Sequence, residues 1–277
     1  MKSKKNLKIK KNLIVLGSNG MLGKNVCYYF HDKYNIIKIK KRINPNNVEN
    51  ILKDLNKEKK ALIINCIGKI PQKKIELDEM YFSNYIFPKK LSETLNKKHL
   101  LIHPSTDCVF SGISKKSYSK KDKPDPKDHY GISKYLAENT LIKRKNTLII
   151  RVSIIGKNSK TKKDLLTWFL YKKKEVNGFE NHYWNGITTL EWCKKIDFLI
   201  LNRKNSSVQV NLIHLGTKKK YSKYEVLNNF KDVFQKKIKI KKIKLYYSNK
   251  CLIPDFFSPS LREQLTEFKS QNYYEKL

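Results

Sequence analysis

The chain has 277 residues, 39% of them hydrophobic, which is enough to bury the core of one doubly wound sheet with a small lobe and argues against disorder. Lys and Arg number 60 against 24 Asp and Glu, a formal net charge of +36. No run approaches the ~20 apolar residues of a membrane span, and the apolar run after the basic residues 1–11 is too short for a signal peptide. These observations predict a cytoplasmic protein that does not enter a membrane.

The five cysteines are odd in number and contain no C-x-x-C pair, which predicts a reducing compartment, no disulfide framework and no zinc site. The six histidines show no ligand spacing, so we expect no metal. The basic excess leaves a polyanion-binding role open. Lysines recur in every segment without a nucleic-acid motif, however, so the charge indicates solvated surfaces and no specific nucleic-acid partner.

Apolar runs alternate with helical patterns through the first half of the chain. This alternation is typical of a parallel sheet that is covered by helices on both faces, and it predicts the α/β class. The expected strands lie at residues 13–16, 35–39, 62–66, 100–104 and 148–152.

A glycine-rich turn follows the first of these strands and precedes an amphipathic helix. Such a turn lets main-chain N–H groups approach a pyrophosphate, and the helix N-terminus adds a favourable dipole. The strand, turn and helix together predict a dinucleotide site. Its predicted contacts are Gly17, Ser18, Asn19, Gly20, Met21, Leu22 and Gly23.

The end of the second strand indicates which dinucleotide is bound. A site selective for NAD places an acidic residue there, about twenty positions after the glycines, to bind the ribose 2′-hydroxyl. This chain has Lys40, Lys41 and Arg42 instead, which favours NADPH. The alternative is that the three cations form another solvated charge run.

Hydroxyl, phenol and amine groups follow the fourth strand. Thr106 lies at the strand end, where ligands bind in an open α/β sheet. Tyr130 and Lys134 are four residues apart in a predicted helix and therefore share one face. The ammonium is expected to draw the phenol pKa down from ~10, which makes the pair a general acid for a carbonyl oxygen. The alternative is an exposed helix face.

The regular alternation weakens after residue 156. Thr188 with Glu191, and Ser222 with Glu225, fit capping boxes at two helix starts. Residues 237–247 alternate Ile or Leu with Lys, which predicts an edge strand with a charged outer face.

Residues 12–23, 100–110 and 129–134 together resemble the extended short-chain dehydrogenase/reductase superfamily, and within it the dTDP-4-dehydrorhamnose reductase branch. The Ser-Thr-Asp-x-Val-Phe motif at 105–110 is rather specific to that branch, and further matches extend over residues 12–156. The resemblance implies a Rossmann-like NADP-binding domain with the catalytic residues at 1–156. It also implies a smaller, mainly substrate-binding lobe at 157–277, interleaved with the first into one compact unit.

The activity implied by the resemblance is NADPH-dependent reduction of the C4 keto group of a nucleotide-linked 4-keto-6-deoxyhexose. Tyr130 would give the proton, Lys134 would tune Tyr130 and hold the nicotinamide ribose, and Thr106 would orient the keto oxygen. Further contacts to the cofactor's adenosine side would come from Asp54 and Leu55, expected after the second helix, and from Cys66, Ile67 and Gly68.

Candidate contacts to the sugar nucleotide are Asp107, Ser153, His182, Trp184 and Asn185. Asp107 can equally cap its loop, and the residues of the 182–185 segment can equally form a packed loop core. Ile154 stands where rhamnose-pathway members often carry an aromatic residue, which leaves the base and the sugar open. A catalytically silent NADP-binding regulatory subunit and a basic polyanion-binding protein remain alternatives, and the oligomeric state, monomer or homodimer, is also open.

Overall fold

The computed structural model describes residues 10–39, 41–71, 76–157, 163–203 and 211–271. A seven-stranded sheet crosses the molecule in the order β14-β10-β5-β4-β3-β1-β2, and every neighbouring pair in it is parallel. This arrangement confirms the predicted doubly wound parallel sheet and its five N-terminal strands. The strands are β1 (Asn12–Leu16), β2 (Asn35–Lys38), β3 (Leu62–Asn65), β4 (Leu100–Pro104), β5 (Thr147–Arg151), β10 (Leu212–Thr217) and β14 (Phe256–Ser258).

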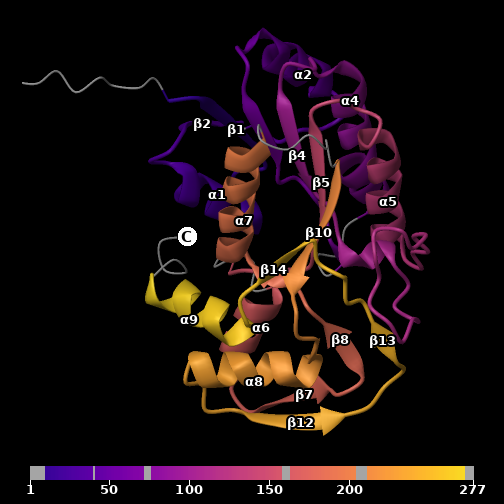
Figure 1. The fold of residues 1–277 in the computed structure, drawn as a ribbon, viewed down its shortest axis with the longest axis vertical. Helices are drawn as coiled ribbons and strands as arrows, with labels where there is room; N and C mark the ends of the chain where they lie inside the picture. Colours follow the sequence, from indigo (N-terminus) through magenta and orange to yellow (C-terminus); the bar gives the residue numbers. More distant parts are fainter. Residues whose placement is uncertain (1–9, 40, 72–75, 158–162, 204–210, 272–277) are drawn as a thin grey trace, which may run out of the picture.

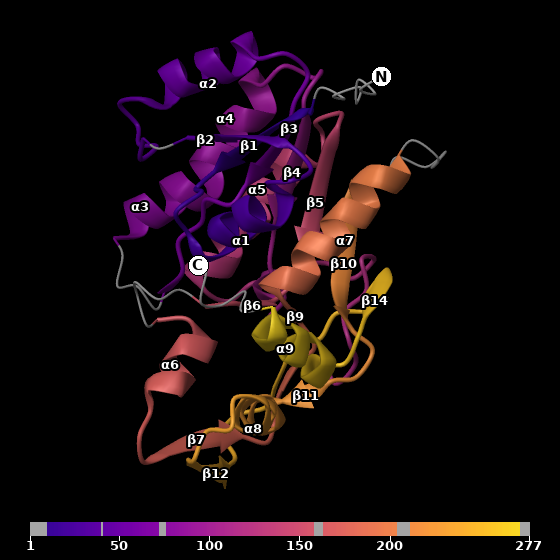
Figure 2. The same cartoon turned by 90° about the vertical axis from the view of Figure 1, so that its left-hand side faces the viewer.

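Helices cover both faces of the sheet because successive side chains of each buried strand point to opposite sides. Leu13 and Val15 of β1 belong to one core cluster, with side chains from α1 (Met21–Phe30) and α7 (Thr189–Asn202). Ile14 and Leu16 belong to the other cluster, with side chains from the remaining face. That face carries α2 (Val48–Lys57), α4 (Phe87–Thr94) and α5 (His129–Leu141) (Figures 1 and 2).

A helical segment precedes α4 in the sequence, is continuous with it and contains a π-helical turn. It begins as α3 (Leu77–Tyr81), continues as η2 (Phe82–Ile86) and runs directly into α4. Single π turns within α-helices frequently mark functional sites. In this chain the π turn carries the buried Asn84.

The C-terminal part of the chain forms a second layer below the carboxyl edge of the sheet (Figure 1). Its own core cluster is rich in aromatic residues. The helices are α6 (Leu165–Tyr171), α8 (Lys223–Val233) and α9 (Leu261–Ser270). The short strands are β6 (Ile154–Ile155), β7 (Glu175–Phe179), β8 (His182–Trp184), β9 (Ile187–Thr188), β11 (Tyr221–Ser222), β12 (Lys239–Ile243) and β13 (Ser248–Asn249).

Two local predictions for this lobe can be compared with the structure. β12 lies within the predicted edge strand and pairs with β7 in a two-stranded sheet, with its lysines exposed. Ser222 and Glu225 form the predicted capping box at α8. At α7, Thr188 caps the helix, but its own N–H donates to Gln264 of α9 at 2.9 Å. That tertiary contact replaces the second bond of the predicted box.

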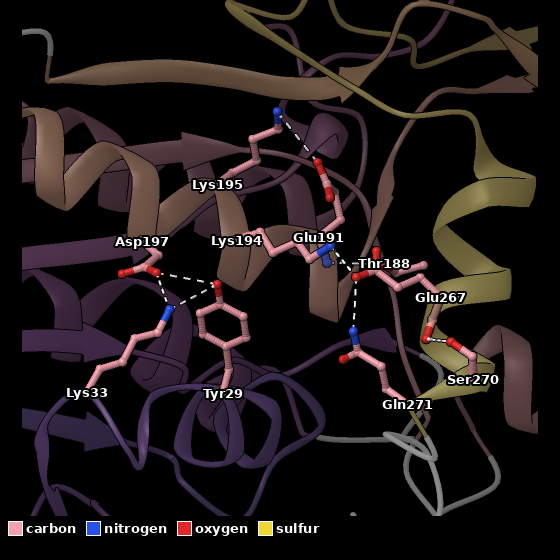
Figure 3. Close-up of polar contacts among 10 residues, drawn as sticks. All are labelled: Tyr29, Lys33, Thr188, Glu191, Lys194, Lys195, Asp197, Glu267, Ser270 and Gln271. Atoms are coloured by element: carbon pink, nitrogen blue, oxygen red, sulfur yellow. Dashed lines mark hydrogen bonds and ion pairs between the residues drawn. The ribbon is translucent and has the colours of Figure 1, made fainter.

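Helix α7 bridges the sheet layer and the lobe through charged groups (Figure 3). Asp197 of α7 pairs with Lys33, in the turn after α1, and accepts a hydrogen bond from Tyr29 of α1 at 3.4 Å. Lys194, on the same helix, pairs with Glu267 of α9. Both halves of the chain therefore contact one helix, and β10 and β14 of the second half complete the sheet of the first. Within the described residues, no helix combines the length and the apolar character needed to cross a bilayer.

Candidate functional site

The glycine-rich turn closes tightly between β1 and α1. Gly17 adopts φ +75°, and a Cβ there would lie 2.9 Å from Ile67 Cγ1, so a larger residue is excluded by both backbone and space. The N–H of Gly20 donates to the Gly17 carbonyl at 3.0 Å, which closes the turn. A Cβ on Gly23 would lie 2.2 Å from that same carbonyl oxygen. The first turn of α1 is thereby brought against the loop, as a phosphate-binding turn requires.

A cavity of about 630 Å³ opens beside this turn. Its walls include Ile67, from the loop after β3, and Phe82, from η2. The rest of the lining comes from the glycine turn, the segment after β2, the loop after β3 and α3. These lining residues include Gly17, Ser18, Asn19, Gly20, Lys41, Arg42, Lys69, Asp78 and Glu79.

Several residues that were predicted to contact the cofactor pack against the protein core or against other residues. Leu22 belongs to the core beneath the sheet, and Met21 packs against the position of Gly156. Cys66 lies partly buried against that same core. Gly68 adjoins Asn84, whose Oδ1 would lie 3.6 Å from a Cβ at this glycine. Lys40 lies outside the described residues.

The prediction for Asp54 and Leu55 is wrong in its local structure. Both residues lie inside α2, which continues to Lys57, and not in a loop after it. Leu55 is buried in the core between α2 and the sheet, whereas Asp54 pairs with Lys57 on the solvent side at 2.9 Å. Neither residue lines the cavity.

Arg42, one of the cations expected to select NADPH, is paired with a carboxylate. Glu79 of α3 pairs with Arg42 and accepts a hydrogen bond from Lys69 at 2.7 Å, so one carboxylate bridges two cations across the cavity wall. Lys41 also lines this wall. Neither Lys69, in the loop after β3, nor Glu79, on α3, belongs to a recognisable motif, so the sequence alone did not predict them as lining residues.

Thr106 and Tyr130 meet at the carboxyl end of β4. Thr106 caps the short helix η3 (Asp107–Val109) by accepting a hydrogen bond from the N–H of Cys108 at 3.1 Å. Its hydroxyl donates to Asp107 at 3.0 Å and lies close enough to the Tyr130 phenol to lower the pKa of that group. Gly131 allows this approach, since a Cβ there would lie 2.2 Å from the Cys108 carbonyl oxygen. The structure therefore brings two predicted catalytic groups into contact.

Lys134 is buried, with a side chain that points to the end of the same strand. Its Nζ donates to the Pro104 carbonyl at 2.6 Å and lies 3.1 Å from Nε2 of His103. Burial lowers the pKa of Lys134 to about 8, although Glu138 opposes this shift. Glu138 forms a buried ion pair with Arg151 of β5 at 2.7 Å.

The predicted direction of the Tyr130 pKa is wrong. Burial raises the pKa of the phenol well above its usual range, and the thiol of Cys108 adds to this shift. The neighbouring Thr106 hydroxyl opposes the shift without overcoming it. Sequence spacing alone could not reveal that the low polarity of the site raises the pKa of the phenol.

Asn84 connects the loop after β3 to α5. Its amide exchanges two hydrogen bonds with the backbone of Lys69, at 2.8 and 2.9 Å, and donates to Ser133 at 3.1 Å. Ser133 precedes Lys134 on α5. The π turn thereby fixes the loop after β3 against the helix that carries Tyr130 and Lys134.

The predicted sugar-nucleotide contacts separate into two groups. Asp107 is buried next to Thr106 and the phenol, and Ser153 is half-buried in the loop after β5. Trp184 is 4% exposed and belongs to the aromatic core of the lobe. Asn185 uses its amide for hydrogen bonds to the backbone of Thr217 and Leu252.

His182 has the surroundings of a packed surface residue. Its ring centroid lies 4.8 Å from those of Phe179 and Tyr246, and its Nε2 lies 2.8 Å from the Tyr246 carbonyl. The contacts of His182, Trp184 and Asn185 correspond to the alternative interpretation of this segment as a packed loop core.

Two lysines that the sequence analysis missed lie close to Asp107. Lys223, the first residue of α8, and Lys250, after β13, both act electrostatically on Asp107 and Cys108. In a chain so rich in lysine, no sequence signal distinguishes these two.

The doubly wound sheet, the glycine turn at its first strand and the Thr106, Tyr130 and Lys134 set at its carboxyl edge define the extended short-chain dehydrogenase/reductase class. The model of the RmlD substrate binding domain family matches residues 11–248, and the chain belongs to this family.

Solved structures with the same fold include two dTDP-4-dehydrorhamnose reductases. The Bacillus anthracis protein, solved in complex with NADP, superposes with a TM-score of 0.83 at 20% identity, over 95% of this chain and 100% of that one. The Clostridium acetobutylicum protein superposes with a TM-score of 0.81 at 19% identity, over 95% and 99%.

A curated relative is the spore coat polysaccharide biosynthesis protein SpsK of Bacillus subtilis (strain 168), which is 29% identical over 149 residues. The match covers 51% of this chain and 52% of that protein, so the chain spans about half the length of the curated relative it matches.

Proposed function

We propose that this protein uses NADPH to reduce the C4 keto group of a nucleotide-linked 4-keto-6-deoxyhexose. The observation that carries the proposal is the proximity of Thr106 to the Tyr130 phenol, with Lys134 one helical turn further along α5. The solved reductases with this fold support the substrate class.

The residues present fit a dinucleotide. The turn at Gly17 leaves a cradle that a side chain would fill, and α1 begins directly after it. Lys41 and Arg42 at the cavity wall suit the extra phosphate of NADPH, since cation–phosphate hydrogen bonds are strong. When bound, the cofactor supplies the hydride, and in this proposal Lys134 holds its nicotinamide ribose.

Tyr130 is the proton donor in this proposal. Its raised pKa keeps the phenol protonated at neutral pH, so the proton is present to be donated, but the same shift makes the phenol a weaker acid. A phenolate forms when the proton leaves, and the ammonium of Lys134 stabilises that charge in a site of low polarity. Thr106 orients the keto oxygen with its hydroxyl.

The charges around Asp107 support an anionic substrate. Lys223 and Lys250 approach this carboxylate from the lobe, next to the phenol. Together they place two cations where the diphosphate of a sugar nucleotide can lie. Asp107 is then available to accept hydrogen bonds from sugar hydroxyls.

The test is mass spectrometry of the purified protein with NADPH and a panel of dTDP- and UDP-linked 4-keto sugars. Tyr130→Phe removes one oxygen and keeps the ring, so NADPH binding should survive while turnover falls by ~10²–10⁴, the usual contribution of a general acid. Tyr135→Phe, on the same helix, is the matched control and should retain full turnover. Retention of more than about half the rate by Tyr130→Phe would refute the mechanism.

The same experiment addresses the regulatory alternative. A silent cofactor-binding subunit would bind NADPH but turn over no sugar nucleotide in the panel. Its partner's activity would be indifferent to Tyr130→Phe. Lys134→Met, in contrast, should weaken both turnover and NADPH affinity in an active reductase, because the lysine serves both.

A further inference from the structure

His103 lies at the centre of a buried chain of hydrogen bonds. It is the fourth residue of β4 and is 0% exposed. On one side, Nδ1 lies 3.2 Å from the Asn65 amide nitrogen at the end of β3. On the other side, Nε2 lies 3.1 Å from Nζ of Lys134.

The donor and the acceptor in each of these hydrogen bonds can be derived by starting from Ile67, next to Asn65. The N–H of Ile67 donates to Oδ1 of Asn65 at 3.2 Å, which fixes the orientation of the amide. The NH₂ group of Asn65 therefore faces His103, and Nδ1 must be the acceptor. A neutral imidazole carries one hydrogen, so in this ring it is on Nε2 and points to Lys134.

The ring N–H faces a group that is ordinarily a donor itself. An ammonium has no lone pair, whereas the uncharged amine can accept this hydrogen bond and still donate to the Pro104 carbonyl. The partial positive charge on the ring hydrogen therefore disfavours the protonated form of Lys134. His103 cannot relieve the conflict by turning its ring, because Asn65 holds the other nitrogen.

We propose that His103, oriented by Asn65, is a positioning residue that directs a ring N–H at Lys134 and makes this lysine a group that gains and loses its proton instead of a permanent cation. The inference deepens the proposed function and rests on it for the role of Lys134. Ile67, where the chain begins, lines the cofactor cavity, so the chain connects that cavity to the catalytic helix.

The electrostatics of the site agree with this geometry. Burial lowers the pKa of Lys134 to about 8. Burial and the neighbouring Lys134 lower the pKa of His103 well below its ordinary value, so the ring is neutral. Glu138 of α5 favours the lysine cation, but Arg151 of β5 is ion-paired with that carboxylate. Tyr130 lies one turn earlier on α5, and its raised pKa keeps the phenol uncharged.

The experiment is an NMR titration of the lysine side chains in isotope-labelled full-length protein. The Lys134 signal is assigned by its absence from Lys134→Met. His103→Leu removes the N–H, and Asn65→Leu frees the ring to place its hydrogen on Nδ1. Both variants should raise the Lys134 pKa by about one unit or more, a tenfold change in its ionisation constant.

Two further variants separate this role from general packing. His103→Gln can accept from Asn65 and donate to Lys134, so it should restore the wild-type titration. His99→Leu replaces another fully buried histidine, which precedes β4 and accepts a hydrogen bond from the N–H of Ala61 at 3.2 Å. It should leave the Lys134 titration unchanged.

An unchanged or lowered Lys134 pKa in His103→Leu would overturn the proposal. If that variant does not fold, the same result in Asn65→Leu would overturn it. The titration needs no substrate, so its outcome is independent of whether the wild-type protein turns over a 4-keto sugar nucleotide. Absence of such turnover would defeat the proposed function while leaving the effect of His103 on Lys134 measurable.

Discussion

At Tyr130 and Lys134, burial shifts both pKa values towards the uncharged form. The phenol pKa is raised and the lysine pKa is lowered to about 8, as expected for desolvated groups of opposite charge type. Near neutral pH the phenol therefore holds its proton firmly, and the lysine is the group of the pair that titrates.

The first prediction concerns the pH dependence of turnover. As pH rises through about 8, Lys134 loses the charge that stabilises the phenolate, while Tyr130 stays protonated. The rate constant kcat should therefore fall above pH ~8. Lys134→Arg carries a charge that does not titrate in this range, so its profile should be flat there. A wild-type profile that stays level to pH 10 would contradict the assignment.

The second prediction concerns acid stability. His214 is fully buried between Arg151 and Phe110, and burial lowers its pKa to about 4, with Arg151 acting in the same direction. In the unfolded chain His214 takes up a proton near pH 6.5, whereas in the folded protein it stays neutral until the pH is much lower. The free energy of unfolding is therefore highest above pH 6.5, and it decreases by on the order of 3 kcal/mol as the pH falls towards 4.

Chemical denaturation at pH 7 and pH 5 measures this effect. The loss of unfolding free energy between the two values should be smaller in His214→Gln than in the wild type. His31→Gln, at an exposed histidine, is the control and should behave as the wild type does. Equal losses in all three proteins would show that His214 contributes nothing to acid sensitivity.

At the scale of elements, the cofactor wall combines groups from three segments. The segment after β2 supplies Arg42, the loop after β3 supplies Lys69, and α3 supplies the Glu79 that pairs with both. A phosphate that binds Arg42 must share that cation with this carboxylate. Glu79 therefore opposes phosphate binding even though it orders the cations.

The third prediction follows from this competition. Glu79→Gln removes the negative charge, so NADPH should bind about three- to tenfold tighter while NADH affinity is unchanged, a gain of ~0.6–1.4 kcal/mol. Calorimetry with both cofactors measures it. Glu76→Gln, at an exposed position just before α3, is the control. Weaker NADPH binding by Glu79→Gln would mean that the carboxylate mainly positions its two cations.

The fourth prediction concerns β8 and its place in the lobe. Trp184 is buried among aromatic residues of the lobe core, so Trp184→Ala should lower the free energy of unfolding by ~3–5 kcal/mol. Trp168→Ala, at a half-buried position on α6, should cost less. Thermal melting alongside kinetics checks this. A selective rise in KM for the sugar nucleotide without loss of stability would instead indicate that Trp184 contacts the substrate.

At the scale of the whole molecule, the charge of +36 is distributed over both layers of the fold. Many lysines form exposed ion pairs, such as Lys241 with Glu175 and Lys90 with Glu49, but basic residues far outnumber acidic ones. Exposed pairs of this kind contribute little to stability. The main effect of the excess is a positive field around the molecule.

The fifth prediction is that this field binds polyanions without selectivity. Heparin and single-stranded DNA of different sequences should bind with similar affinities, and binding should weaken steeply as salt rises, because counterion release drives it. Fluorescence anisotropy at several salt concentrations measures both properties. A strong preference for one DNA sequence that persists at high salt would instead indicate a specific nucleic-acid site.

Local patterns in the sequence determined the architecture of the N-terminal half. Short apolar runs between helical patterns can be buried only as strands of a sheet covered on both faces, so their positions agree with β1 to β5 to within about a residue. The glycine turn and the motif around Thr106 can also be recognised locally. The turn needs glycines, and the motif needs hydroxyl groups, at fixed spacings along the sequence. The same holds for the Tyr130 and Lys134 pair, which share a helix face.

Only the tertiary structure decided the environment of those groups. His103 lies 38 residues from Asn65 and 31 from Lys134 along the chain, so no spacing rule relates them. The direction of the Tyr130 pKa shift depends on burial by surrounding elements, and the nearby Cys108, Asp107 and Asp128 act in the same direction. Asp54 and Leu55 were misplaced because packing against the sheet extends α2 past them. Residue types and spacings are local properties, whereas burial and hydrogen-bond direction depend on contacts between distant segments.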